Sequence, residues 1–151
     1  MCNYPSRRRR LTLTLAVLSI AVWCVALGGC GSDRLPVAPV EGKVLYNGTP
    51  LEFGSVVFQA QAGPPSRGAI QPDGTFVLTT YSDGDGAIIG TNDVRITCFE
   101  SQWPGYVVDE SEEELGVGKS LIPRKYASPG QSGLKEEVKA ENQPFVFELT
   151  D

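Results

Sequence analysis

The chain has 151 residues, with 13 lysines and arginines against 18 aspartates and glutamates, and it contains no histidine. This length is sufficient for one domain with a hydrophobic core, and the net charge of −5 disfavours binding to nucleic acid and to anionic lipid head groups. The absence of histidine excludes a Ser-His-Asp triad and removes the commonest zinc ligand.

Residues 1–29 have the order of a helical signal peptide. Arg7–Arg10 form a basic cluster, Leu11–Leu27 is an uncharged and mostly apolar run, and two glycines precede Cys30. The apolar run is slightly shorter than the roughly 18 residues typical of a spanning helix. An uncleaved membrane anchor and a plain secretory cut remain as alternatives to a lipoprotein leader.

The segment Leu27-Gly28-Gly29-Cys30 resembles the lipobox of bacterial lipoproteins. In that family a peptidase cuts before the cysteine, whose sulfur carries a diacylglyceryl group, and the new N-terminus is usually acylated, for example with palmitate. The resemblance implies cleavage between Gly29 and Cys30 and lipidation of Cys30. Several acyl chains anchor a protein more firmly than one. We therefore expect a membrane-anchored protein of the cell envelope, at the outer membrane or at the periplasmic face of the inner membrane.

Loss of the leader would remove Arg7–Arg10 and leave 9 basic against 18 acidic residues, for a net charge of −9. Of the four cysteines only Cys98 would remain with a free sulfur, so the mature domain is expected to hold no internal disulfide. Cys98 alternates in phase with Val94 and Ile96. This alternation places Cys98 on the core side of its strand, and the chain has no histidine that could deprotonate its thiol. We therefore predict that Cys98 is a small core residue and does not act as a nucleophile.

The mature chain shows short strand patterns and no sustained helical stripe. After a lipidated tether at residues 30–39, strands are predicted at residues 40–46, 53–60, 67–71, 75–80, 93–100, 134–138 and 145–149. Turns are predicted at Asn47-Gly48 and Pro72-Asp73-Gly74, and Gly54 is predicted to be a bulge or a close approach. Such strands indicate an all-β antiparallel sandwich or small barrel, and we expect a single sandwich of about seven strands over residues 40–151.

The stretches "VEGKVLYNGTPLEFGSVVF", "AIQPDGTFVLTT" and "GDGAIIGTNDVRIT" resemble the carboxypeptidase regulatory-like, or transthyretin-like, β-sandwich family. The tail "IPRKYASPGQSGLKEEVKAENQPFVFELT" is similar to small lipoproteins of planctomycete bacteria, and within it Ile122 and Tyr126 are expected to clasp the sheet. Asn92 departs from the family pattern, which often has an aromatic residue there. The resemblance implies a fold and an envelope location, and it brings no catalytic residues.

Two segments carry candidate binding chemistry. The acids Asp83, Asp85 and Asp93 are candidates for an irregular calcium site, although the EF-hand spacing is absent and an Asp-Gly turn is the simpler interpretation. The stretch from residue 101 to 119 is either a solvated connection or a recognition loop for a cationic partner. Its candidate contact residues are Trp103, Tyr106, Asp109, Glu112, Glu113 and Glu114.

These patterns predict a non-catalytic binding or structural module that needs no cofactor. Its expected partners are the membrane, through the lipid on Cys30, and an envelope protein or polysaccharide, with no nucleic acid. A calcium-dependent adhesion or carbohydrate-binding module is the alternative.

Overall fold

Short β-strands make up most of the regular structure of this chain. The computed structural model describes residues 34–106 and 118–151, which belong to one compact unit, Arg34–Asp151. The predicted signal peptide, Cys30 and the acidic candidates at positions 109–114 lie outside the described residues. Within the described part of the chain, no helix is long and apolar enough to span a membrane. The fold is all-β, as the strand patterns predicted.

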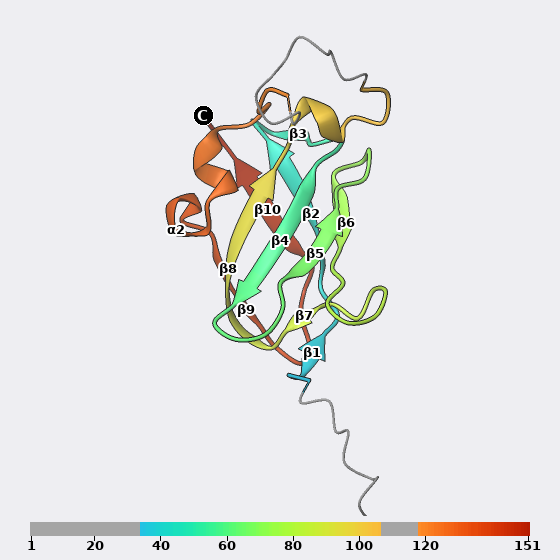
Figure 1. The fold of residues 1–151 in the computed structure, drawn as a ribbon, viewed down its shortest axis with the longest axis vertical. Helices are drawn as coiled ribbons and strands as arrows, with labels where there is room; N and C mark the ends of the chain where they lie inside the picture. The colour runs from blue at the N-terminus through green and yellow to red at the C-terminus, as the bar shows by residue number, and fades with distance from the viewer. Residues whose placement is uncertain (1–33, 107–117) are drawn as a thin grey trace, which may run out of the picture. The chain divides into compact units, whose positions relative to one another are not determined.

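The first four-stranded sheet is built around β2 (Glu41–Tyr46). β3 (Thr49–Pro50) and β6 (Thr75–Val77) pair with successive parts of β2 in the antiparallel direction. β10 (Phe145–Leu149) pairs with β2 in parallel over five residues of each strand (Figure 1). The expectation of purely antiparallel pairing is therefore wrong here, because the last strand returns to β2 after a crossover that contains most of the domain.

The second four-stranded sheet is antiparallel throughout. Its order is β5 (Ser66–Ala69), β4 (Ser55–Ala60), β8 (Gly90–Thr97) and β9 (Lys135–Val138). The backbones of Arg67 and Thr79 exchange two hydrogen bonds of 2.9 Å, which connect the β5 edge to the segment that follows β6. β5 is therefore hydrogen-bonded on both sides, to β4 and to the segment that contains Thr79.

The compact unit begins earlier than the predicted boundary at residue 40. β1 (Val37–Ala38) pairs with β7 (Ala87–Ile88), and the Ala38 side chain is buried. Residues 34–39 thus belong to the folded unit, and the predicted tether at residues 30–39 is corrected for this part. The sequence did not predict this pairing, because β1 and β7 are far apart in the chain and two residues are too few to show an alternating pattern.

The predicted turns are confirmed. Asn47 (φ 50°) and Gly48 (φ 80°) both have the positive φ angles of a tight hairpin turn between β2 and β3. Gly54 has a φ of 131°, and a Cβ atom at this position would overlap the carbonyl oxygen of Thr97. Gly54 is therefore a close approach between β4 and the end of β8.

The core lies where the inner faces of the two four-stranded sheets meet. Phe58 of β4 contacts Phe145 and Phe147 of β10 edge to face, with ring centroids 5.8 and 6.1 Å apart. Cys98 is fully buried, as predicted, and this burial raises the pKa of its thiol to about 11. The other fully or nearly fully buried side chains of this core include Val44, Val56, Phe58, Phe76, Leu78, Val94, Ile96 and Phe147, whereas Phe145 is only partly buried.

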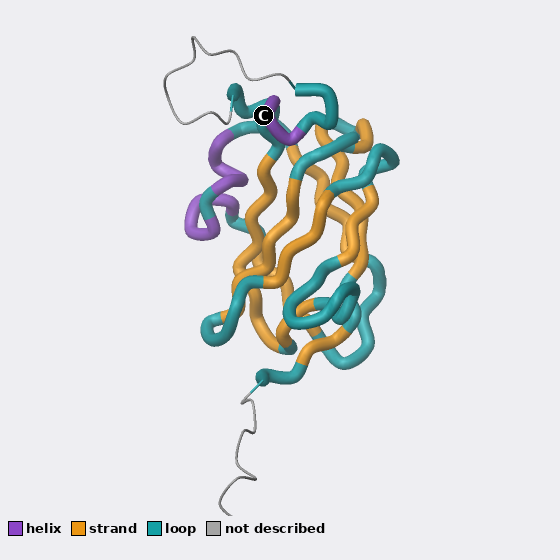
Figure 2. The backbone as a smooth tube through the Cα atoms, turned by 45° about the vertical axis from the view of Figure 1, so that its right-hand side comes forward, coloured by secondary structure: helices purple, strands orange, loops and turns teal. Residues whose placement is uncertain are grey.

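Within the described residues, three short helical turns lie at the margins of the strands (Figure 2). They are η1 (Glu100–Gln102), η2 (Arg124–Ala127) and α2 (Pro129–Ser132). Ile122 and Tyr126 are buried, and the Tyr126 hydroxyl donates to the Thr150 carbonyl at 2.9 Å and accepts from the Thr150 N–H at 3.1 Å. The predicted clasp is confirmed, and it holds the C-terminal end of the chain.

Candidate functional site

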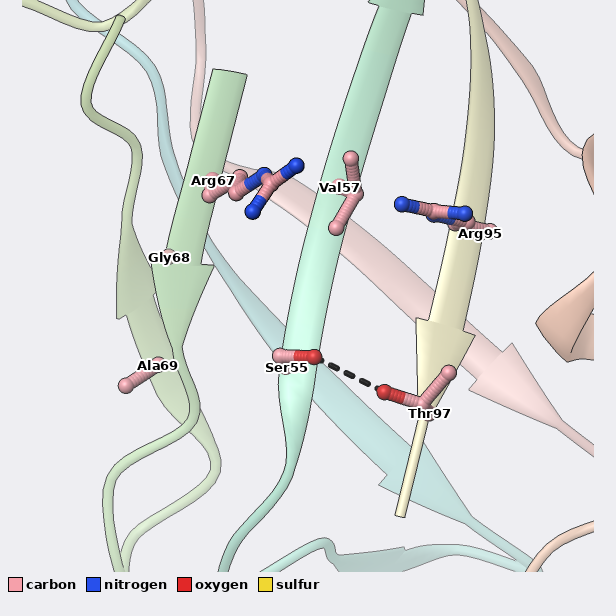
Figure 3. Close-up of a pocket in the computed structure, with 7 residues that line it drawn as sticks. All are labelled: Ser55, Val57, Arg67, Gly68, Ala69, Arg95 and Thr97. Atoms are coloured by element: carbon pink, nitrogen blue, oxygen red, sulfur yellow. Dashed lines mark hydrogen bonds between the residues drawn. The ribbon is translucent and has the colours of Figure 1, made fainter. Parts of the chain in front are cut away.

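Two arginines flank a valine on the outer face of the second sheet. Arg67 of β5 and Arg95 of β8 are both register partners of Val57 on β4, so the three side chains form a row on the face opposite Val56 and Phe58. Both guanidinium groups are turned toward Val57 (Figure 3). Val57 is only 6% exposed despite its outward position, because the arginine stems cover it. We call this row and its flanking residues the two-arginine face.

Neither guanidinium group has a partner within residues 34–106 and 118–151. The ion pairs formed by those residues are Lys135–Asp93 at 3.1 Å and Lys139–Glu137 at 3.8 Å, and no hydrogen bond involves the side chain of Arg67 or Arg95. The two arginines stand on strands that are two sheet spacings apart, about 9.5 Å between backbones. Their like charges repel one another, and an anion placed between them would relieve the repulsion.

A pair of hydroxyl groups forms the next row of the same face. The Ser55 and Thr97 hydroxyl oxygens are 2.8 Å apart and hydrogen-bonded. Gln102 donates its Nε2–H to Ser55 at 3.3 Å, and its Oε1 accepts from the Phe99 N–H at 2.7 Å, which fixes the orientation of the amide. One hydroxyl hydrogen is used between Ser55 and Thr97, so the other remains available to a ligand.

The rows of arginines and hydroxyls line an open depression of about 440 Å³. Its lining residues are Ser55, Val57, Arg67, Gly68, Ala69, Arg95 and Thr97. All seven come from β5, β4 and β8, and the β5 edge is fixed by the Arg67–Thr79 bridge. The depression is therefore built from regular, hydrogen-bonded strands, which hold its side chains in place.

Trp103, a predicted contact residue, lies in the segment after β8 and does not line the depression. It follows Gln102 in the chain, packs against Phe53 with ring centroids 4.9 Å apart at an angle of 71°, and is 48% exposed. Tyr106, the other aromatic candidate, is half-buried, and its N–H donates to the Trp103 carbonyl at 3.0 Å. The two arginines of the depression were not among the predicted contact residues, and neither Trp103 nor Tyr106 lines it.

The three candidate calcium ligands do not form a common site. Asp85 Oδ1 accepts from the Thr80 N–H at 2.7 Å, and Oδ2 accepts from the N–H groups of Tyr81 and Ser82 at 3.0 and 2.9 Å. Asp83 is exposed, and Asp93 pairs with Lys135. In the described part of the chain, no group of three or more histidine, cysteine, aspartate or glutamate residues could hold a metal ion. The geometry corresponds to a carboxylate-capped turn.

Replacement of Asp85 by alanine is expected to destabilise the protein by about 1–2 kcal/mol at neutral pH, as loss of a capping side chain does. Burial raises the pKa of Asp85, but the backbone hydrogen bonds from Thr80, Ser82 and Tyr81 lower it further, so the folded-state pKa lies below its ordinary value of 3.8. This stabilisation is present above the unfolded-state pKa and is lost as the pH falls through the folded-state value.

Urea unfolding at neutral pH and below about pH 3 would measure this effect, and the difference between wild type and Asp85→Ala should shrink at the lower pH. The matched control is Asp83→Ala, two residues away in the same turn, which should leave stability unchanged. Equal destabilisation by the two variants would contradict the capping role of Asp85.

Asn92 carries a buried polar side chain at the opposite end of β8. Its Nδ2 donates to the carbonyls of Ile88 and Gly90, each at 2.9 Å, and its Oδ1 has no hydrogen-bond partner among the described residues. The family that the sequence resembles often has an aromatic residue at this position. In this chain the Asn92 amide instead holds the turn between β7 and β8 through its two hydrogen bonds to backbone carbonyls. We therefore assign Asn92 a structural role.

Comparison with known proteins gives no relative: no family model, no curated protein and no solved structure matches this chain. The interpretation of the two-arginine face accordingly depends on its geometry. The alternation of Val94 and Ile96 with Arg95 indicates that Arg95 points outward from its strand. No sequence pattern indicates that Arg67 lies on the same face, on the other side of Val57.

Proposed function

We propose that the mature chain is a lipid-anchored, non-catalytic binding module of the bacterial cell envelope, built on a transthyretin-like β-sandwich. The observation that carries the binding role is a pair of guanidinium groups, on the two strands that flank β4, that have no partner among residues 34–106 and 118–151. The lipobox-like segment ending at Cys30 supports the anchor. Together they support a solvent-facing recognition surface on a domain held at a membrane.

The arrangement of the strands supports the sandwich part of the proposal. Two four-stranded sheets share one core through Phe58, Phe76 and Phe147, and all pairings except β2–β10 are antiparallel. The outer faces of such a structure are available for recognition, because only the inner faces are buried. The two-arginine face is one of these outer faces.

The chemistry of the two-arginine face supports binding in preference to catalysis. The hydroxyls of Ser55 and Thr97 bond to one another, and arginine remains protonated and cannot serve as their general base. The Cys98 thiol is buried, and its pKa of about 11 keeps it protonated near neutral pH. The calcium-dependent alternative receives no support from Asp85, whose oxygens already accept three backbone hydrogen bonds.

Substitution of Cys30 by serine is expected to abolish lipid attachment. The full chain would be expressed in a bacterium supplied with an alkyne-labelled fatty acid, and intact mass and label would be measured in the membrane fraction. We expect a labelled wild-type protein that begins at Cys30 and an unlabelled Cys30→Ser protein, because the thioether requires the cysteine sulfur.

The control for this experiment is Cys98→Ala, which removes the other mature cysteine and should leave the label in place. A wild-type product that begins at another residue, or a Cys30→Ser protein that keeps its label, would reject the lipoprotein part of the proposal. The binding part would be tested separately by retention on isolated envelope polymer.

A further inference from the structure

We propose that the two-arginine face binds a carboxylated polysaccharide of low charge density, with one sugar carboxylate held between Arg67 and Arg95. The inference rests on the proposed binding function and names the ligand class that the site would take. It commits to a sugar polymer bearing spaced carboxylates, such as a uronic acid chain. The argument uses the charge of the face, its neighbouring groups and the charge of the whole domain.

An anionic group is required by the charge of the face. Arg67 and Arg95 lack ion pairs in the described part of the chain, and no carboxylate lines the depression between them. Both guanidinium groups are directed at the space above Val57 (Figure 3). A carboxylate in this space would accept hydrogen bonds from both planar forks, in the geometry that arginine favours.

A sugar is indicated by the groups that continue the face beyond the arginines. Ser55 and Thr97 together offer one free hydroxyl hydrogen and unused acceptor lone pairs, which match the hydroxyls of a sugar ring. A simple inorganic anion would use only the arginines, whereas a sugar acid would also use the hydroxyl pair.

The low charge density is indicated by the rest of the domain. After residue 29 the chain carries 9 basic and 18 acidic residues, so a densely charged polyanion would meet general repulsion. Asp93 lies two residues from Arg95, and Glu137 lies opposite the neighbouring part of β8. A polymer with one carboxylate per sugar can place a single charge between the arginines while the remainder of its surface stays neutral.

The test is calorimetric titration of the full-length protein in non-ionic detergent with a short oligogalacturonate. We expect saturable binding that weakens about tenfold in Arg67→Gln and in Arg95→Gln, since each variant loses charge-assisted hydrogen bonds to the carboxylate. The matched control is Arg124→Gln, which removes the same charge from the exposed part of η2 and should bind as wild type does.

Three further probes separate the ligand classes. Methyl-esterified oligogalacturonate keeps the sugar and removes the charge, poly-glutamate keeps the carboxylates and removes the sugar, and dextran sulfate has a sugar backbone with dense charge. Each should bind at least tenfold more weakly than oligogalacturonate. Equal binding of any of the three would overturn the proposed ligand class, and unchanged binding by both glutamine variants would overturn the site.

Folding of the variants would be checked by thermal unfolding. If a glutamine variant unfolds, the lysine variant of the same residue replaces it, and it should bind more weakly than wild type because lysine lacks the planar fork.

Retention of the protein on isolated envelope polymer distinguishes a failure of this binding site from a failure of the proposed binding function as a whole. Equal retention of wild type and arginine variants would reject this site and leave the binding function standing, whereas no retention of wild type would reject both.

Discussion

Replacement of Phe58 by alanine is expected to lower the free energy of unfolding by about 3–5 kcal/mol, the usual cost of removing a large buried aromatic ring. Phe58 is completely buried and contacts Phe145 and Phe147 of the opposite sheet edge to face. Its loss would leave a cavity between the two sheets and remove both aromatic contacts. Urea denaturation followed by tryptophan fluorescence would measure the change.

The control for this prediction is Val77→Ala. Val77 also lies on a strand, β6, but it is 54% exposed, so its truncation should cost less than about 1 kcal/mol. A Phe58→Ala protein as stable as the Val77→Ala protein would show that the two sheets do not share the core described above.

Replacement of Gly86 by alanine is expected to destabilise the protein by several kcal/mol, in the range of the larger single-residue effects. Gly86 has a φ of 92°, which a residue with a Cβ atom adopts at a cost of about 1–2 kcal/mol. A Cβ atom at this position would also overlap the carbonyl oxygen of Ala38. Because the obstacle is backbone, the clash can be relieved only by separating β1 from β7.

Gly84 offers a matched control within the same turn. Its φ is 69°, but a Cβ atom there would meet no atom within 4 Å. Gly84→Ala therefore carries the conformational cost alone, and the difference between the two variants measures the clash with Ala38. Amide hydrogen exchange at Ile89, whose N–H donates to Pro36 at 3.0 Å, should accelerate in Gly86→Ala and not in Gly84→Ala. Equal exchange would contradict the proposed separation of β1.

The parts of the fold that were predicted from sequence are those determined by neighbours in the chain. The turn at Asn47-Gly48 follows from the tolerance of these residues for positive φ, and the inward positions of Val94 and Ile96 follow from the two-residue period of a strand. The clasp residue Tyr126 was predicted from resemblance, and its burial is confirmed; its hydrogen bonds to Thr150 were not predicted.

The parts that were not predicted depend on which distant segments pair. The proximity of Arg67 and Arg95 requires that β5 and β8 flank β4 with Val57 in register with both, and no local pattern specifies that register. The pairing of β1 with β7 was missed for the same reason. Asp85 is a candidate calcium ligand on sequence because aspartates alternate with glycines around it, as at the start of a calcium loop. In the structure both of its carboxylate oxygens accept hydrogen bonds from three backbone N–H groups of the turn, and the sequence pattern does not indicate these bonds.

The parallel pairing of β2 with β10 has a consequence for the order in which the fold can be completed. β10 covers one edge of β2 and supplies Phe147 to the core, and the Tyr46 hydroxyl donates to Asp151, which lies 105 residues later in the chain. During synthesis β2 therefore leaves the ribosome long before its partner does. Until β10 has been released, the edge of β2 that it covers has unpaired backbone groups and Phe58 lacks part of its covering. The sheet around β2 therefore stays open at one edge throughout the synthesis of the second sheet, whose strands all lie between β2 and β10 in the chain.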